Sequence, residues 1–121
     1  NALLIAAMLV EAIFGLGFIL SPGALLNPMG ITLDGASDAL ARLFGTAIFS
    51  LAVLAWLARR SGSHAFKRGA VITLLAYYLL SGGLFVIIIL NGLMNAMGWS
   101  TVILHLGLAA WCGASLVTKR G

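Results

Sequence analysis

The sequence predicts an all-α protein, an integral membrane four-helix antiparallel bundle that forms a single domain over residues 1–121. Two observations lead to this prediction. Of the 121 residues, 62% are hydrophobic and only 8% are charged, which is more apolar surface than a soluble core of this length can bury. The chain also contains four apolar runs of about 20 residues, the length that crosses a hydrocarbon core of roughly 30 Å.

The first apolar run covers residues 2–20. A cleavable signal peptide is the alternative interpretation of an apolar N-terminal segment. However, no basic residue precedes Ala2, and no site of the A-x-A type follows the run. We therefore predict a membrane span here, followed by three further spans over residues 39–58, 69–90 and 97–117.

Residues 21–38, SPGALLNPMGITLDGASD, separate the first two spans and are rich in turn-forming residues. Pro22 and Pro28 each disfavour helix at the preceding residue. We expect an ordered outer loop at the membrane interface, whose apolar side chains either dip into the headgroups or cover the mouth of the bundle. Asp34 or Ser37 is then in position to cap the second span.

The distribution of charge predicts the topology, because cytoplasmic loops collect Lys and Arg. The outer loop holds Asp34 and Asp38 and no basic residue. The basic residues lie between the second and third spans and at the C-terminus: Arg59, Arg60, Lys67, Arg68, Lys119 and Arg120. Four spans with both termini in the cytoplasm satisfy this pattern, and the expected location is the inner membrane of a bacterium.

The same placement accounts for the net charge of +4 without nucleic acid. The basic clusters are short and lack interleaved aromatic residues, so their expected contacts are membrane lipids. The single cysteine, Cys112, lies inside the fourth span, where we expect it to serve as a small packing residue.

Small or polar residues recur at a spacing of four in each span, which places them on one helix face. We predict that these stripes face inward, because membrane helices pack through small residues and interhelical hydrogen bonds. The stripes are Ala7, Glu11 and Gly15; Asp38, Arg42, Thr46 and Ser50; Gly69, Thr73, Tyr77 and Ser81; and Thr101, His105, Ala109 and Gly113.

Three of these residues, Glu11, Ser81 and His105, share a depth of roughly 12 to 14 Å below the outer ends of their spans, at about 1.5 Å per residue. Arg42 starts only about 5 Å deep, and its side chain can point down to Glu11 or outward to the headgroups. We predict a buried polar cluster of these four residues. It is either a polar staple that holds the bundle together or a proton-linked, ion-binding or headgroup-binding site.

The aromatic residues suggest two further roles. Trp56 and Trp99 stand at span ends, where interfacial anchors are expected. Tyr77, Tyr78 and Trp111 lie deeper and are candidates to line a ligand groove. No catalytic residue, metal site or cofactor is predicted, since Glu11 and His105 offer only two metal ligands, but a bound lipid or quinone is left open.

Three stretches of the sequence resemble the DoxX-like and related uncharacterised tetraspan bacterial membrane proteins. They are FGLGFILSPGALL, ARLFGTAIFSLAVLAWLARR and GWSTVILHLGLAAW. The resemblance implies a four-helix bundle and, for some relatives, association with quinone or respiratory enzymes. Only Arg42 and Gly45 match a motif position, and no catalytic residue follows from them. LVEAIFG is also locally similar to the first helix of the small multidrug resistance family, whose transporters use a membrane-embedded acid.

The combined prediction is a non-catalytic accessory or structural subunit that packs against other membrane subunits, for example in an electron-transfer complex. It depends on the scarcity of residues outside the spans and on the apolar surface of every helix. Two alternatives stay open: a proton- or cation-coupled small transporter centred on Glu11, and a lipid- or quinone-binding module.

Overall fold

The computed structural model describes residues 1–118, and this part of the chain is helical and contains no strand. Its elements are α1 (Ala2–Leu20), α2 (Pro22–Leu26), the 3-10 helix η1 (Asn27–Met29), α3 (Gly35–Arg60), α4 (His64–Leu90) and α5 (Gly98–Thr118). The four long helices α1, α3, α4 and α5 are each long and apolar enough to cross a membrane. The all-α, four-helix prediction is confirmed, and the protein is a small tetraspan membrane protein.

Two of the predicted spans begin several residues later than the helices do. The second and third spans were expected to begin at residues 39 and 69, but α3 begins at Gly35 and α4 at His64. Apolarity marks the stretch that suits lipid, whereas a helix continues through polar turns that are well capped. The segment 21–38, expected as an ordered loop, accordingly contains α2, η1 and the first turn of α3.

Asp34 caps α3, as one of the two candidates predicted. Its carboxylate accepts a hydrogen bond from the Ser37 amide at 2.8 Å, and the Ser37 hydroxyl accepts one from the Asp34 amide, also at 2.8 Å. This reciprocal pair is a capping box. It satisfies amide groups that the first turn of a helix otherwise leaves without partners.

Acid should weaken this cap. Hydrogen bonds from the Ser37 amide and hydroxyl hold the pKa of the Asp34 carboxyl below its usual range. A lowered pKa in the folded state stabilises the fold above the ordinary pKa, and this stabilisation is lost as the pH falls through the lowered value. Thermal unfolding in detergent from pH 7 to pH 3 should show a smaller acid-induced drop in Asp34→Asn, which keeps a capping oxygen, than in the parent. An equal drop would contradict the prediction.

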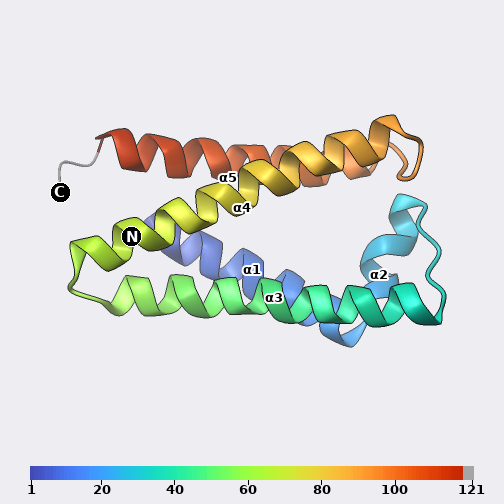
Figure 1. The fold of residues 1–121 in the computed structure, drawn as a ribbon, viewed down its shortest axis with the longest axis horizontal. Helices are drawn as coiled ribbons and strands as arrows, with labels where there is room; N and C mark the ends of the chain where they lie inside the picture. The colour runs from blue at the N-terminus through green and yellow to red at the C-terminus, as the bar shows by residue number, and fades with distance from the viewer. Residues whose placement is uncertain (119–121) are drawn as a thin grey trace.

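The long helices form two antiparallel pairs, α1 with α3 and α4 with α5 (Figure 1). In the first pair the backbones touch. A Cβ atom added to Gly45 would lie 2.8 Å from the Gly15 carbonyl oxygen and 2.8 Å from the Ile19 amide nitrogen. Glycine at both positions therefore permits an approach that any side chain would prevent.

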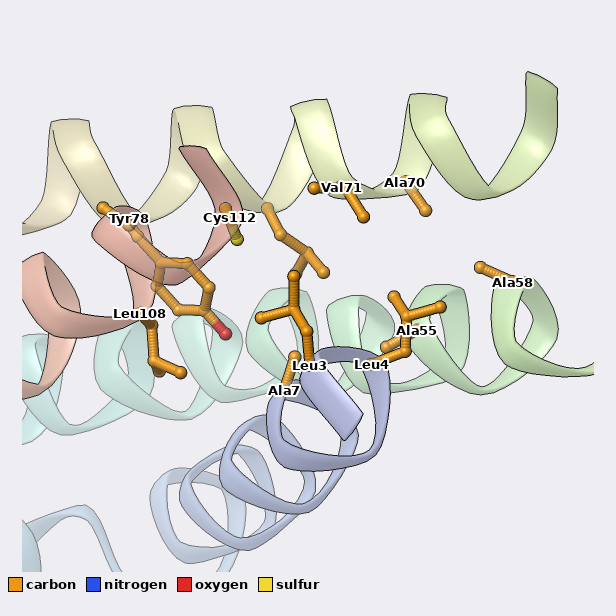
Figure 2. Close-up of a cluster of buried hydrophobic side chains, with 12 residues drawn as sticks. Leu3, Leu4, Ala7, Ala55, Ala58, Ala70, Val71, Tyr78, Leu108 and Cys112 are labelled. Atoms are coloured by element: carbon orange, nitrogen blue, oxygen red, sulfur yellow. The ribbon is translucent and has the colours of Figure 1, made fainter. Parts of the chain in front are cut away.

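The two pairs meet in one hydrophobic cluster, which Figure 2 shows. It lies toward the end of the bundle that holds the α3–α4 connection, which we call the basic end; the cap end is the opposite end, with α2, η1 and the loop of residues 91–97. Tyr78 and Cys112 are fully buried in this cluster, so Cys112 packs as expected. Its members are Leu3, Leu4, Ala7, Ala55, Ala58, Ala70, Val71, Leu74, Tyr78, Leu108, Ala109 and Cys112.

The prediction of four inward-facing polar stripes is wrong for α3, and it is also wrong for the first half of the α4 stripe, where Gly69 and Thr73 are exposed. Arg42, Thr46 and Ser50 are exposed, and α3 instead buries Gly45, Ile48, Ala52, Ala55 and Ala58. The hydroxyls of the stripe need no neighbouring helix, because they donate to carbonyls of α3 itself: Thr46 to Leu43 at 2.6 Å and Ser50 to Thr46 at 2.9 Å. A hydroxyl that is satisfied in this way can face lipid.

The helix surfaces carry many exposed large apolar side chains on all four spans, including Leu20, Leu80, Ile103 and Val117. Trp56 and Trp99 are also partly exposed, and the Arg60 guanidinium lies 5.4 Å from the centre of the Trp56 ring. Arg59, Arg60, Lys67 and Arg68 gather at the basic end, and Asp34 and Asp38 lie at the cap end. Lys119 and Arg120 lie outside the described residues. The cytoplasmic placement of both termini stays a prediction.

Candidate functional site

A cavity of about 300 Å³ lies between the two helix pairs, toward the cap end. Every helix, including α2 and η1, contributes to its lining. The walls are mostly apolar and include five aromatic side chains: Phe14 and Phe18 from α1, Phe44 from α3, and Tyr77 and Phe85 from α4. The lining also includes one carboxyl group, from Glu11, and one imidazole, from His105.

Glu11 presents one free oxygen to this cavity. Only 3% of the residue is exposed, and its Oε2 atom accepts a hydrogen bond from the Tyr78 hydroxyl at 2.9 Å. The other oxygen, Oε1, has no hydrogen-bond partner within residues 1–118. In that part of the chain, every fully buried side-chain nitrogen or oxygen does have a partner. Oε1 must therefore retain some accessibility, and because Glu11 lines the cavity, the cavity is where this atom is reached.

His105 has a similar arrangement on α5. Its Nδ1 atom lies 2.8 Å from the Thr101 carbonyl oxygen, and since a carbonyl only accepts, Nδ1 carries the hydrogen and donates it. In the neutral ring Nε2 is then an acceptor. Nε2 has no hydrogen-bond partner in the described part of the chain and is not fully buried, although only 8% of the residue is exposed. It too is open to the cavity that His105 lines.

The tyrosines connect these two residues. Tyr78 binds Glu11 through its hydroxyl, and its ring centre lies 5.9 Å from that of His105. The Tyr77 ring centre lies 5.7 Å from His105, and the Phe85 ring centre lies 5.3 Å from it. Ser81 follows Tyr77 by one helical turn along α4 and does not line the cavity. The structure thus brings Glu11 and His105 together beside the two tyrosines.

Arg42 does not join this cluster, and the prediction that placed it there is wrong. Its Nε atom pairs with Asp38 at 2.8 Å, and its Nη1 atom donates to the Ile19 carbonyl at 2.6 Å and to the Leu20 carbonyl at 3.3 Å. The side chain leans toward the N-terminus of its own helix, away from Glu11. There it satisfies carbonyls that the end of α1 leaves without partners.

The three residues predicted to line a ligand groove do not share one site. Tyr77 lines the cavity, whereas Tyr78 is fully buried in the core and Trp111 is 43% exposed. Trp111 follows His105 by six residues, which rotates it by about 240° around α5, at about 100° per residue, and carries it to another face. The four phenylalanines that line the cavity were not predicted. Their spacing was a usable signal, because Phe14 and Phe18 follow Glu11 by three and seven residues.

The cap segment formed by α2 and η1 covers the cavity with Leu25, Leu26 and Met29. Asn95, in the loop between α4 and α5, fastens this segment: its side-chain amide donates to the Pro28 carbonyl at 2.9 Å, and its backbone amide donates to the Met29 carbonyl at 2.8 Å. Gly30 follows with a φ of 83°, the left-handed conformation that side chains disfavour. The cap therefore joins both helix pairs above the cavity (Figure 1).

The site offers hydrogen-bonding groups and aromatic surfaces. Among residues 1–118, no three His, Cys, Asp or Glu side chains lie close enough to hold a metal ion. The cavity instead offers a carboxyl oxygen and an imidazole nitrogen, each able to bind a polar group, among aromatic rings that favour a flat apolar one.

No protein-family model matches this chain, and neither a curated protein nor a solved structure is significantly similar to it. The resemblances to the DoxX-like proteins and to the small multidrug resistance family therefore stay predictions.

Proposed function

We propose that the protein binds a lipid-soluble molecule with a flat polar ring, of the quinone class, in the cavity beneath the cap segment. The observation that carries this proposal is the pair of free polar atoms, Glu11 Oε1 and His105 Nε2, which belong to almost fully buried residues that line the cavity.

Energetics favour a polar ligand at this position. A polar group without a hydrogen-bond partner is costly in an apolar environment, so a ligand that supplies the partner offsets that cost. A quinone carbonyl accepts from a protonated carboxyl, and the hydroxyl of the reduced form donates to a carboxylate or to Nε2. Glu11 thus has a suitable group for both redox states of the ring, and His105 has one for the reduced state.

The size and walls of the cavity suit a ring headgroup whose tail stays in lipid. A volume of about 300 Å³ lies at the lower end of small-molecule sites. Phe14 and Phe44 line the cavity and are still 37% and 40% exposed, so the cavity reaches the lipid-facing surface of the bundle. An apolar tail attached to the ring has a direct route into the bilayer there.

A quinone-binding role is compatible with the predicted role as an accessory subunit. A module that holds a quinone-class molecule beside a larger electron-transfer complex needs no catalytic residue of its own. The exposed apolar side chains on all four spans suit either lipid or a neighbouring membrane subunit.

Titration of the reduced ring, a ubiquinol carrying one isoprene unit kept reduced under anaerobic conditions, into the purified protein in detergent micelles tests the proposal, because its hydroxyls can donate to His105 Nε2. We expect saturable binding, seen as quenching of tyrosine and tryptophan fluorescence relative to empty micelles. His105→Leu should weaken this binding at least about tenfold, because it removes one hydrogen-bonding group from the cavity at a cost of roughly 1.4 kcal/mol or more.

His64→Leu is the matched control, since His64 lies at the basic end, outside this cavity. It should bind the ubiquinol like the parent protein. Absence of saturable binding in the parent, or equal weakening in both histidine variants, would rule out the proposed site.

A further inference from the structure

A second and larger cavity, of about 590 Å³, lies at the basic end of the bundle. Its rim carries the basic side chains of His64, Lys67 and Arg68, all from the first two turns of α4. Its interior is apolar and includes Leu3, Val71 and Leu116 from three different helices. The predicted role of Lys67 and Arg68 as topology signals does not account for a cavity of this size beside them.

The positive charge on this rim is not neutralised within the described residues. The one ion pair among residues 1–118 joins Arg42 to Asp38 and lies at the opposite, cap end. The three acidic residues of the chain are Glu11, in the middle of α1, and Asp34 and Asp38, at the cap end. Lys67 and Arg68 therefore have no carboxylate partner in residues 1–118, and an anion at the rim would meet uncompensated positive charge.

We propose that this cavity binds one anionic phospholipid, with its phosphate at Lys67 and Arg68 and its acyl chains against the apolar interior. The guanidinium of Arg68 can donate two hydrogen bonds to a phosphate, and the Lys67 ammonium adds a compact charge. The positive end of the α4 dipole adds to the same field, because both residues follow the start of the helix closely.

A membrane lipid suits the cavity better than a free anion does. Both basic residues lie in the opening turns of a helix that is apolar enough to span a membrane, which places the rim at headgroup height. Basic pockets between membrane helices at this height commonly hold lipid headgroups. The acyl chains of a lipid can fill the apolar interior, whereas inorganic phosphate has no apolar part that could do so.

Native mass spectrometry of the full chain, released from micelles doped with phosphatidylglycerol or with phosphatidylcholine of the same chains, tests the proposal. We expect one phosphatidylglycerol to stay bound under conditions that strip phosphatidylcholine. The double variant Lys67→Gln/Arg68→Gln should weaken this retention roughly thirtyfold, in line with the loss of two basic residues near a headgroup.

The double variant Arg59→Gln/Arg60→Gln is the matched control. It removes the same charge from the same end of the bundle, but neither residue lines the cavity. It should retain phosphatidylglycerol like the parent protein. Equal loss in both double variants would show diffuse surface attraction and overturn the proposal, as would displacement of the lipid by millimolar inorganic phosphate. The experiment does not involve Glu11 or His105, so its outcome is independent of quinone binding.

Discussion

Gly45→Val is expected to push α1 away from α3 and to lower the free energy of unfolding by at least about 3 kcal/mol. A Cβ at this position would lie 2.8 Å from three atoms: the Gly15 carbonyl oxygen, the Ile19 amide nitrogen and the Phe18 Cβ. Two of these belong to the backbone and cannot rotate out of the way. The strain therefore falls on the whole helix pair rather than on one adaptable side chain.

Gly83→Val and Gly107→Val are the matched controls for this prediction. Both glycines lie inside long helices, and a Cβ at either one meets no heavy atom of the surroundings within 4 Å. Unfolding by titration with a denaturing detergent, followed by circular dichroism, should leave both controls near the parent midpoint. If the midpoint of Gly45→Val is the same as that of the controls, close backbone packing does not hold α1 against α3. If it behaves as expected, quinone binding should also weaken, because Phe18 and Phe44 line the cavity from these two helices.

Replacement of Glu11 should separate the two interpretations of the buried polar cluster. Glu11→Leu leaves the fully buried Tyr78 hydroxyl without its acceptor, and we expect a loss of about 2 kcal/mol in the free energy of unfolding. Glu11→Gln keeps a carbonyl oxygen at the same position, so the Tyr78 hydrogen bond and the stability should both persist. Detergent titration of the two variants measures the difference.

A double-mutant cycle with Tyr78→Phe assigns the effect to this one hydrogen bond. Once the hydroxyl is gone, Glu11→Leu should cost about 1 kcal/mol less than it does in the parent, because no donor is left unsatisfied. Equal costs in the two backgrounds would mean that Glu11 stabilises the bundle by another route.

Glu11→Gln also tests the functional interpretation directly. If the residue is only a polar staple, the glutamine variant keeps both its stability and its quinone affinity. If it binds ligand or protons, the fold persists but quinone affinity or pH-dependent transport in proteoliposomes falls. Transport would further require the helices to move, since the buried side chains of the hydrophobic cluster pack between the two pairs.

Much of the candidate site could be predicted from residue type and depth. Glu11 and His105 share a level in their spans, and both lie in the cavity lining. The error over Arg42 arose because its side chain can reach either way from its position. The structure shows that the carbonyls at the end of α1 and the carboxylate of Asp38 are its partners, and they lie closer to the start of α3 than Glu11 does.

Four membrane-spanning helices, and a cap of the second one by Asp34 or Ser37, could be predicted from the sequence alone. Composition and the local spacing of residues suffice for both, because they depend on neighbours along the chain. Only the tertiary structure decided that the stripe of α3 faces outward, that Tyr78 binds Glu11 and that a cavity lies under the cap segment. Periodicity shows which residues share a helix face, but the rotation of each helix is set by how closely its partner can approach, as the contact of Gly15 with Gly45 shows.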